Sequence, residues 1–377
     1  MDLDFSEEQE MLRGMVRGLL AEHCPIDVVR QLEDDETGYP AELWKQLGEV
    51  GVIGMRLPET HGGSGQSLLD TAVVYEELGR ALAPTPHFPS AVLAGGAILA
   101  GGSEAQRSQW LPRIASGDAV IAPAWLEPDR GYGAKGVQLQ AIADGDDFRL
   151  SGVKRHVAFA AAANQLLVLA RTGAGEGDID LFLVDPASPG VTLQQQLSMA
   201  SDAQFRVGFE DVRVPAASRL GAGGSGWAVW DRMMLEGVVL LAAQAIGGAE
   251  RALEITVEYA KERKQFDKPL GAFQAISHYL ADASTKIDGG RTLVYEAAWA
   301  DGAGQPIERL APMAKLFACQ TYRDTTAMCE QVWGGVGFTI EYDIQLYFRR
   351  AKQLQLSWWD TRMLEERVAA SVLDAKR

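Results

Sequence analysis

The sequence predicts a multi-domain α+β protein: an N-terminal helical domain, a middle antiparallel β-barrel or sandwich, and a C-terminal four-helix bundle. Helical hydrophobic spacing dominates residues 1–119, and short β-rich runs separated by Gly, Pro and Asp turns fill residues 120–215. Long helical segments return in residues 216–377. With 377 residues, 47% of them hydrophobic, the chain is long enough for roughly two to three domains.

The N-terminal helical domain begins with a capping box. In Ser6-Glu7-Glu8-Gln9 the serine hydroxyl and the Gln9 side chain can bond otherwise unpaired amides of the first helical turn, and apolar residues follow at helical spacing. Further helices are predicted over residues 41–50, 68–83 and 103–115.

The middle domain has no helical pattern between its short apolar runs, which disfavours βαβ units and favours antiparallel strands. The predicted strands are Val137–Ile142, Phe148–Leu150, Gln165–Ala170, Ile179–Val184, Val191–Gln195 and Gln204–Phe209. In the C-terminal domain, four long helices are predicted over residues 226–263, 273–302, 306–334 and 341–374, which indicates a bundle.

The composition excludes several classes of function. The chain has 35 basic and 51 acidic side chains, a net charge of −16, which disfavours nucleic-acid and anionic membrane surfaces because both need a basic partner. Its cysteines (Cys24, Cys319 and Cys329) and histidines show no metal-binding spacing, so no metal is expected. Because the cysteines are too few and too scattered for a disulfide framework, a reducing, cytoplasmic location is expected. The start lacks a signal-peptide pattern, and no apolar run reaches the ~20 residues of a membrane span.

One weak motif is interpreted as structural. Residues 221–226 match the dinucleotide fingerprint G-x-G-x-x-G, but no buried parallel strand precedes them and no βαβ unit surrounds them. They are expected to form a flexible interdomain loop.

Two C-terminal segments place Arg263, glutamine side chains and open glycine backbone beside helix ends. Such groups suit a bound pyrophosphate and adenine. A structural alternative makes Arg263 a surface cation and the glycines a helix stop.

These segments and the domain order resemble the acyl-CoA dehydrogenase family of FAD-dependent flavoproteins, and the resemblance covers essentially the whole chain. The chain resembles a divergent bacterial-type member of this family. The family patterns are R-x-x-F-G followed by F-Q, and Q-x-x-G-G-x-G-F. The matching residues are Arg263, Phe266, Gln274, Gln331, Gly334, Gly335, Gly337 and Phe338, with Asp267 where the family has glycine. The resemblance implies that these positions bind FAD, with the Gln331 loop reaching the flavin of a neighbouring subunit.

The resemblance also assigns two stretches of the β domain to covering the flavin ring. In T-E-P-x-x-G-S-D, Leu126 replaces the Thr and Tyr132 replaces the Ser that usually meets the CoA arm. In K-x-W-I-T, His156 replaces the ring-stacking Trp and Ala158 replaces the Thr. Backbone contacts to flavin are therefore implied at Leu126, Val157 and Ala158, with an altered CoA channel at Tyr132.

The family reaction needs a carboxylate that removes the α-proton of an acyl thioester while the β-hydrogen leaves as hydride to flavin N5. Most members carry this Glu in a Y-E-G-T turn, where this chain has a Trp, with Asp360 nearby. A smaller set, resembling isovaleryl- and long-chain acyl-CoA dehydrogenases, carries it in L-E-R-L on the first long C-terminal helix. Here that run is Leu235-Glu236-Gly237-Val238, so Glu236 is the expected base and Asp360 the fallback. The structural alternative for Glu236 is an exposed helix acid favoured by the helix dipole.

Trp358 and Trp359 have two interpretations, as core residues or as walls of the acyl cavity that reshape it for a branched, cyclic or dicarboxylic group. We expect one residue in each role.

The resemblance implies an acyl-CoA substrate oxidised to a trans-2-enoyl-CoA, an electron-transfer flavoprotein as acceptor, and a homotetramer built as a dimer of dimers. An alternative is a non-catalytic or cofactor-completing subunit of an α2β2 acyl-CoA dehydrogenase, because several side chains of the flavin-covering stretches are replaced. A third hypothesis is a different flavin reaction on the same fold, such as an oxidase or a monooxygenase.

Overall fold

The computed structural model describes residues 5–374, which divide into two compact units. The first unit comprises the described residues up to Val29, Ser67–Ala83 and those from Val238 onward, and the second comprises Arg30–Gln66 and Pro84–Gly237. Helix α7 (Gly226–Glu262) begins in the second unit and continues into the first.

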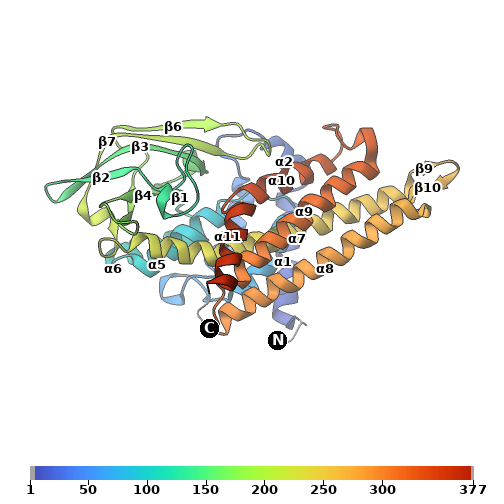
Figure 1. The fold of residues 1–377 in the computed structure, drawn as a ribbon, viewed down its shortest axis with the longest axis horizontal. Helices are drawn as coiled ribbons and strands as arrows, with labels where there is room; N and C mark the ends of the chain where they lie inside the picture. The colour runs from blue at the N-terminus through green and yellow to red at the C-terminus, as the bar shows by residue number, and fades with distance from the viewer. Residues whose placement is uncertain (1–4, 375–377) are drawn as a thin grey trace. The chain divides into compact units, whose positions relative to one another are not determined.

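The β-sheet of the second unit confirms the expected middle domain. Within the described residues it has eight strands, in the order β6-β7-β3-β2-β4-β5-β8, with β1 paired to β4 (Figure 1). The strands are β1 (Ile121–Ala124), β2 (Gln140–Asp144), β3 (Asp147–Ala158), β4 (Gln165–Arg171), β5 (Ile179–Val184), β6 (Val191–Gln196), β7 (Gln204–Val214) and β8 (Arg219–Leu220).

Most strand pairs are antiparallel, as expected, but β4 pairs in parallel with both β1 and β2. Strand β1 enters the sheet after a helix rather than through a hairpin, so no tight turn forces it to run antiparallel. The sheet buries an apolar cluster that includes Phe182, Phe205 and Val207. Strand β3 is irregular where it pairs with β7, between Lys154 and Val157, and His156 in this bulge has φ +53°.

The helical part of the second unit precedes the sheet. It contains α3 (Ala41–Glu49), the 3₁₀ turn η1 (Glu59–His61), the π-helix η2 (His87–Gly95), α5 (Gly96–Gly101) and α6 (Glu104–Ala115). Helix α2 (Ile26–Gln31) lies where the two units divide the chain. Ser103 caps α6 through a capping box, which explains the start of this helix at the predicted position.

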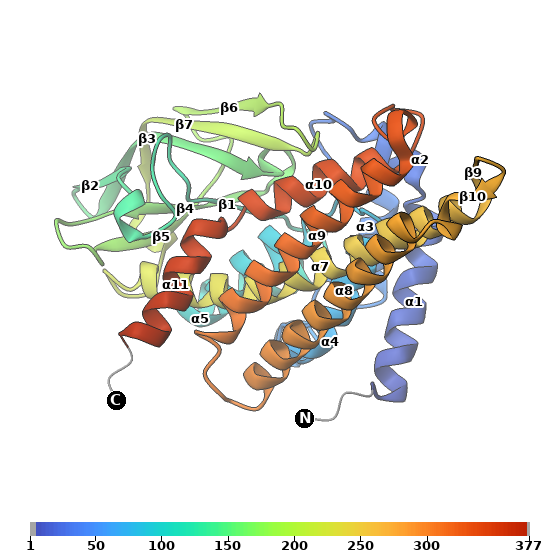
Figure 2. The ribbon, with the colours of Figure 1, turned by 45° about the vertical axis from the view of Figure 1, so that its right-hand side comes forward.

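The first unit is helical. It contains α1 (Glu7–His23), whose predicted Ser6–Gln9 capping box is confirmed, and α4 (Leu68–Arg80). Helices α8 (Gln274–Gly302) and α9 (Leu310–Trp333) pack side by side, and a short hairpin of β9 (Lys264–Gln265) and β10 (Lys268–Pro269) precedes α8 (Figure 2). The 3₁₀ turn η7 (Gly334–Val336) ends α9.

The prediction of one final helix over residues 341–374 was wrong. The chain forms α10 (Ile344–Leu356) and α11 (Thr361–Leu373), separated by a sharp turn. Trp358 and Trp359 in this turn have φ +53° and +75°, a left-handed conformation that ends a right-handed helix.

Helix α7 is long and apolar enough to cross a membrane by length and composition alone. However, 83% of its apolar window is buried inside the structure. The core helix of a globular protein has the same properties, so α7 is weak evidence for a membrane span.

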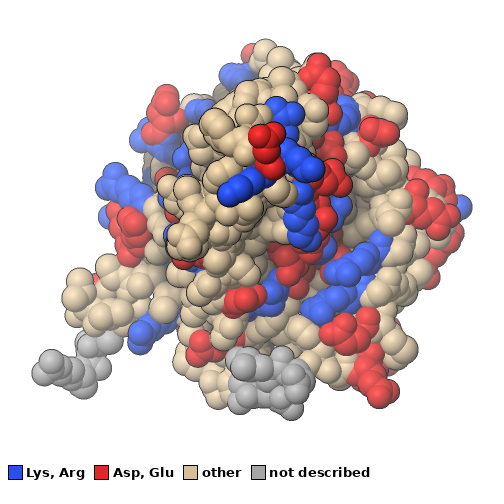
Figure 3. Space-filling view, turned by 90° about the vertical axis from the view of Figure 1, so that its right-hand side faces the viewer, with Lys and Arg blue, Asp and Glu red and all other residues tan. Residues whose placement is uncertain are grey.

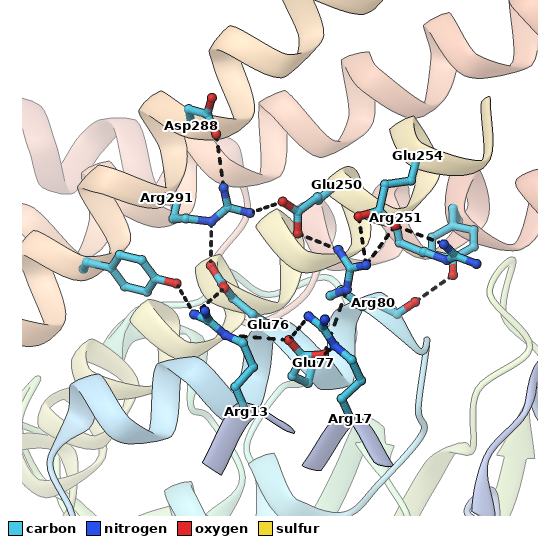
Figure 4. Close-up of polar contacts among 12 residues, drawn as sticks. Arg13, Arg17, Glu76, Glu77, Arg80, Glu250, Arg251, Glu254, Asp288 and Arg291 are labelled. Carbon is cyan, nitrogen blue, oxygen red and sulfur yellow. Dashed lines mark hydrogen bonds and ion pairs between the residues drawn. The ribbon is translucent and has the colours of Figure 1, made fainter. Parts of the chain in front are cut away.

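An ionic network ties α1 and α4 to α7 and α8 within the first unit (Figure 4). Arg17 binds Glu77 through two hydrogen bonds of 2.8 and 2.7 Å. Arg80, at the end of α4, binds Glu250 at 2.5 Å and Glu254 at 2.8 Å. The remaining members shown in Figure 4 include Arg13, Glu76, Arg251, Asp288 and Arg291.

Candidate active site

Glu236, the expected base, lies on α7 in the second unit with both carboxylate oxygens bound by guanidinium groups. Arg56 Nη2 donates to Oε2 at 2.7 Å, and Arg232 Nε, one helical turn earlier, donates to Oε1 at 2.8 Å. The Glu236 side chain is only 17% exposed, so it is not the exposed helix acid of the structural alternative. Each carboxylate oxygen has two lone pairs, so each oxygen of Glu236 keeps an acceptor position besides the one that its arginine uses.

Arg56 was missed by sequence reasoning. It precedes Glu236 by 180 residues and lies in the segment between α3 and η1, where no pattern connects it to α7. Arg232 carried a local signal, because an Arg and a Glu four residues apart on a helix face each other.

Gly237 occupies the position where the family pattern has arginine, and the packing of η2 explains the change. A Cβ at Gly237 would lie 3.0 Å from Phe88 Cε2 and 3.1 Å from Leu93 Cδ2. Any side chain larger than hydrogen would therefore require the Phe88 and Leu93 side chains to shift by a few tenths of an ångström.

Asp360, the fallback base, acts as a helix cap in the first unit. Its Oδ1 accepts a hydrogen bond of 2.9 Å from the Met363 backbone amide, which caps the N-terminus of α11. Of the two neighbouring tryptophans, Trp359 is 0% exposed with Arg367 stacked over its ring, whereas Trp358 is partly exposed.

The two stretches of the β domain that contain Leu126 and Val157 are joined by a buried ion pair. Lys154 Nζ donates to Glu127 Oε1 at 2.7 Å and to the Trp125 carbonyl oxygen at 3.2 Å. Burial lowers the pKa of Lys154 to about 8, against the opposing effect of Glu127. The Arg155 amide also donates to the Leu126 carbonyl oxygen at 2.9 Å. The backbone frame that carries Leu126 and Val157 is therefore fixed although the family's hydroxyl side chains are replaced.

Tyr132, on the loop after Pro128, packs in an aromatic row of the second unit. Its ring lies 5.8 Å from Trp125, which lies 5.2 Å from the buried Trp230 on α7. This row places a bulky, partly exposed side chain where the family has a small hydroxyl.

The first of the C-terminal motifs lies around the β9–β10 hairpin in the first unit. Arg263 is exposed and makes no ion pair among the described residues, and Phe266 at the turn is 87% exposed. Asp267 has φ +61°, a left-handed conformation that glycine adopts most readily and aspartate tolerates, which explains the replacement. Gln274 is the exposed first residue of α8. Figure 3 views the molecule from the side toward which the hairpin projects in Figure 1. Lys and Arg side chains gather on the part of that surface nearest the viewer.

The second motif forms the turn that ends α9. Gln331 is exposed, and Gly334 has φ +67° and ψ −146°, a conformation that is essentially restricted to glycine. A Cβ built on Gly335 meets no atom within 4 Å, so its backbone is open to a ligand. An exposed guanidinium, amide side chains and open glycine backbone fit a bound pyrophosphate.

The structure thus places Arg263, Phe266, Gln274 and the Gln331–Gly335 turn in the first unit, and Leu126, Val157, Ala158, Tyr132 and Glu236 in the second. Across residues 5–374, no group of three or more His, Cys, Asp or Glu side chains could hold a metal ion.

Comparison with known proteins identifies three matching domain families along the chain. Residues 6–118, 122–212 and 224–371 match the N-terminal, middle and C-terminal domains of acyl-CoA dehydrogenase. A short-chain specific acyl-CoA dehydrogenase of Clostridium acetobutylicum is 31% identical over 93% of this chain and 94% of its own. The caffeyl-CoA reductase-Etf complex subunit CarC of Acetobacterium woodii is 31% identical over 92% and 93%. Among solved structures, the ChsE4-ChsE5 complex from Mycobacterium tuberculosis contains a chain with a TM-score of 0.90 and 29% identity, covering 100% of both chains.

Proposed function

Because the chain belongs to the acyl-CoA dehydrogenase family, we propose that it oxidises an acyl-CoA thioester to a trans-2-enoyl-CoA with Glu236 as the base that takes the α-proton. The observation that carries the assignment is the contrast between the two candidate carboxylates. Glu236 is held in a defined position on α7 by two guanidinium groups, whereas Asp360 uses its carboxylate to cap α11. A base must be positioned within reach of the proton that it removes, and Glu236 alone has side-chain partners that position it.

In this proposal Arg56 and Arg232 are positioning residues. They hold the Glu236 carboxylate in one orientation in the resting chain. Arg232 is the more exposed of the two, at 44% against 25% for Arg56, and comes from the same helix, so it can turn toward solvent.

FAD would be held by the two motif groups described above. The Arg263 guanidinium and the backbone of Gly334 and Gly335 suit the pyrophosphate, and the exposed Gln274 and Gln331 amides suit polar groups of the nucleotide. Backbone at Leu126, Val157 and Ala158 would cover the ring. When bound, FAD supplies the acceptor for the β-hydride.

The proposal includes an electron-transfer flavoprotein as acceptor and a homotetramer as the assembly, in the cytoplasm. The relative named as a subunit of a caffeyl-CoA reductase-Etf complex supports the acceptor. Phe338 and Ile340, which follow the glycine turn, are 68% and 77% exposed, and such an apolar patch suits a subunit contact.

A second candidate function is that of a partner subunit in an α2β2 acyl-CoA dehydrogenase. Two observations favour it. Leu126 and Ala158 stand where the family has hydroxyl side chains. Both carboxylate oxygens of Glu236 accept hydrogen bonds from arginines. The similarity to a chain of the ChsE4-ChsE5 complex is consistent with an assembly of two different chains.

The test is the visible spectrum of the purified chain, followed anaerobically while a panel of acyl-CoA thioesters is added. We expect a yellow protein that bleaches with one class of thioester, and no bleaching in Glu236→Gln. Glu258→Gln is the matched control, because Glu258 lies on the same helix with a side chain 65% exposed. Bleaching in Glu236→Gln would reject the base, and a colourless wild-type chain would favour the partner-subunit function.

A further inference from the structure

A hydrogen-bonded chain of side chains ends at His156 in the second unit. The Ser198 hydroxyl donates to Asp202 Oδ1, and Gln204 Nε2 donates to Asp202 Oδ2 at 2.8 Å. Gln204 Oε1 then lies 2.7 Å from His156 Nδ1. We call Asp202, Gln204 and His156 the histidine relay.

The relay determines which ring nitrogen of His156 carries the proton. A carboxylate can only accept hydrogen bonds, so the Gln204 amide must turn its NH₂ group toward Asp202 and its oxygen toward His156. An oxygen acceptor at 2.7 Å requires that Nδ1 be the donor. In the neutral imidazole, Nε2 is therefore the acceptor nitrogen, and it has no hydrogen-bond partner among the described residues.

The backbone of His156 is held as firmly as its ring. Its amide donates to Gln196 Oε1 at 2.9 Å, and its left-handed φ lies in the bulge of β3. The preceding residue, Arg155, is bonded to the Leu126 carbonyl oxygen, and the following residues are Val157 and Ala158. The oriented imidazole thus lies within the stretch that the proposed function assigns to covering the flavin.

We propose that the histidine relay fixes the Nδ1–H tautomer of His156 so that Nε2 accepts a hydrogen bond from an N–H group that the flavin ring gains on reduction. This inference rests on the proposed function, because it needs a flavin beside the bulge. An acceptor for that N–H stabilises the reduced ring, so the relay raises the reduction potential of the flavin and favours transfer of the substrate hydride to it. A purely structural relay needs only the donor to Gln204, and a side chain without the second ring nitrogen would join the strands equally well.

Two variants separate these roles. In His156→Asn the amide can replace Nδ1–H as donor to Gln204, but the acceptor at the Nε2 position is lost. In His156→Gln the longer side chain can bring an oxygen to the Nε2 position. Gln204→Leu is the third variant, because it removes the partner that sets the tautomer while leaving the ring in place.

The first measurement needs no flavin and no turnover. Long-range ¹H–¹⁵N correlation spectra of the histidine-labelled chain, stripped of flavin and kept at alkaline pH, report the tautomer directly. We expect the Nδ1–H pattern for His156 in the wild type and its loss in Gln204→Leu. An Nε2–H pattern in the wild type would overturn the proposal.

The second measurement is the reduction potential of the FAD-loaded variants. We expect His156→Asn to lower the ratio of reduced to oxidised flavin at least tenfold at fixed potential, about 30 mV for a two-electron couple, and His156→Gln to restore part of it. Equal potentials in wild type and His156→Asn would overturn this inference and leave the dehydrogenase function intact. A chain that binds no FAD would overturn both, and the two failures are thereby distinguished.

Discussion

Lys315 on α9 donates from Nζ to the backbone carbonyl oxygen of Trp359, 2.7 Å away, and to that of Ser357 at 2.6 Å. The lysine is completely buried, and burial lowers its pKa to about 8. It therefore fixes, from inside the first unit, the turn that breaks the final helix and carries the two tryptophans.

Lys315→Met should change how stability depends on pH. The folded-state pKa of about 8 lies below the ordinary 10.5, so between these values the unfolded chain binds more protons and the wild type gains stability as pH rises. The gain is about 3 kcal/mol over the full window. Urea unfolding at pH 7.5 and pH 10 should show this gain in the wild type relative to Lys315→Met, and a constant difference between the two proteins would contradict it.

Glu330→Gln should stabilise the protein above neutral pH. Glu330 is 2% exposed, neither carboxyl oxygen has a hydrogen-bond partner in the described structure, and burial raises its pKa to about 7. Its contribution to stability is present below the ordinary 4.5 and is lost as pH rises through 7, a change of about 3 kcal/mol. Denaturant unfolding at pH 8 should therefore favour Glu330→Gln, with little difference at pH 4.5. The exposed Glu365→Gln is the control, and an equal gain there would attribute the effect to net charge.

The elements that the sequence predicted well are those set by local patterns. The Ser6–Gln9 capping box and strands such as β4 and β5 are encoded within a few residues of themselves. The break at Trp358 and Trp359 was missed because its partner, Lys315, precedes Trp359 by 44 residues, and nothing in the aromatic pair itself indicates a left-handed turn.

The candidate site also combines features that local patterns predict with features that depend on distant contacts. The family motifs identified Glu236 and Asp360 as candidate bases, but they did not predict which residues contact these carboxylates. The Arg56 contact to Glu236 depends on packing across 180 residues. The capping role of Asp360 did carry a signal, because an Asp directly before a helical pattern is a preferred N-cap.

Arg80→Ala should destabilise the first unit by about 3 kcal/mol, because it leaves acids of the ionic network without their cation. The Arg80 side chain is 15% exposed and contacts Glu250 and Glu254, while Glu77 nearby is 2% exposed. Arg362→Ala is the control: Arg362 pairs with Glu366 on the surface of α11 at 85% exposure, and we expect no measurable change. Urea unfolding at low and high salt measures both variants, and equal small effects would show that the network contributes no more than a surface pair.

Asp360→Ala and Asp360→Asn should distinguish a helix cap from a catalytic base. Asn caps a helix about as well as Asp, whereas Ala removes the bond to the Met363 amide and costs about 1 kcal/mol. If the carboxylate only caps α11, Asp360→Asn should match the wild type in both stability and the rate of flavin reduction, and Asp360→Ala should lose stability alone. A base cannot be replaced by an amide, so loss of flavin reduction in a fully stable Asp360→Asn would transfer the catalytic role from Glu236 to Asp360. Thermal unfolding combined with anaerobic stopped-flow reduction by the best thioester decides between these outcomes.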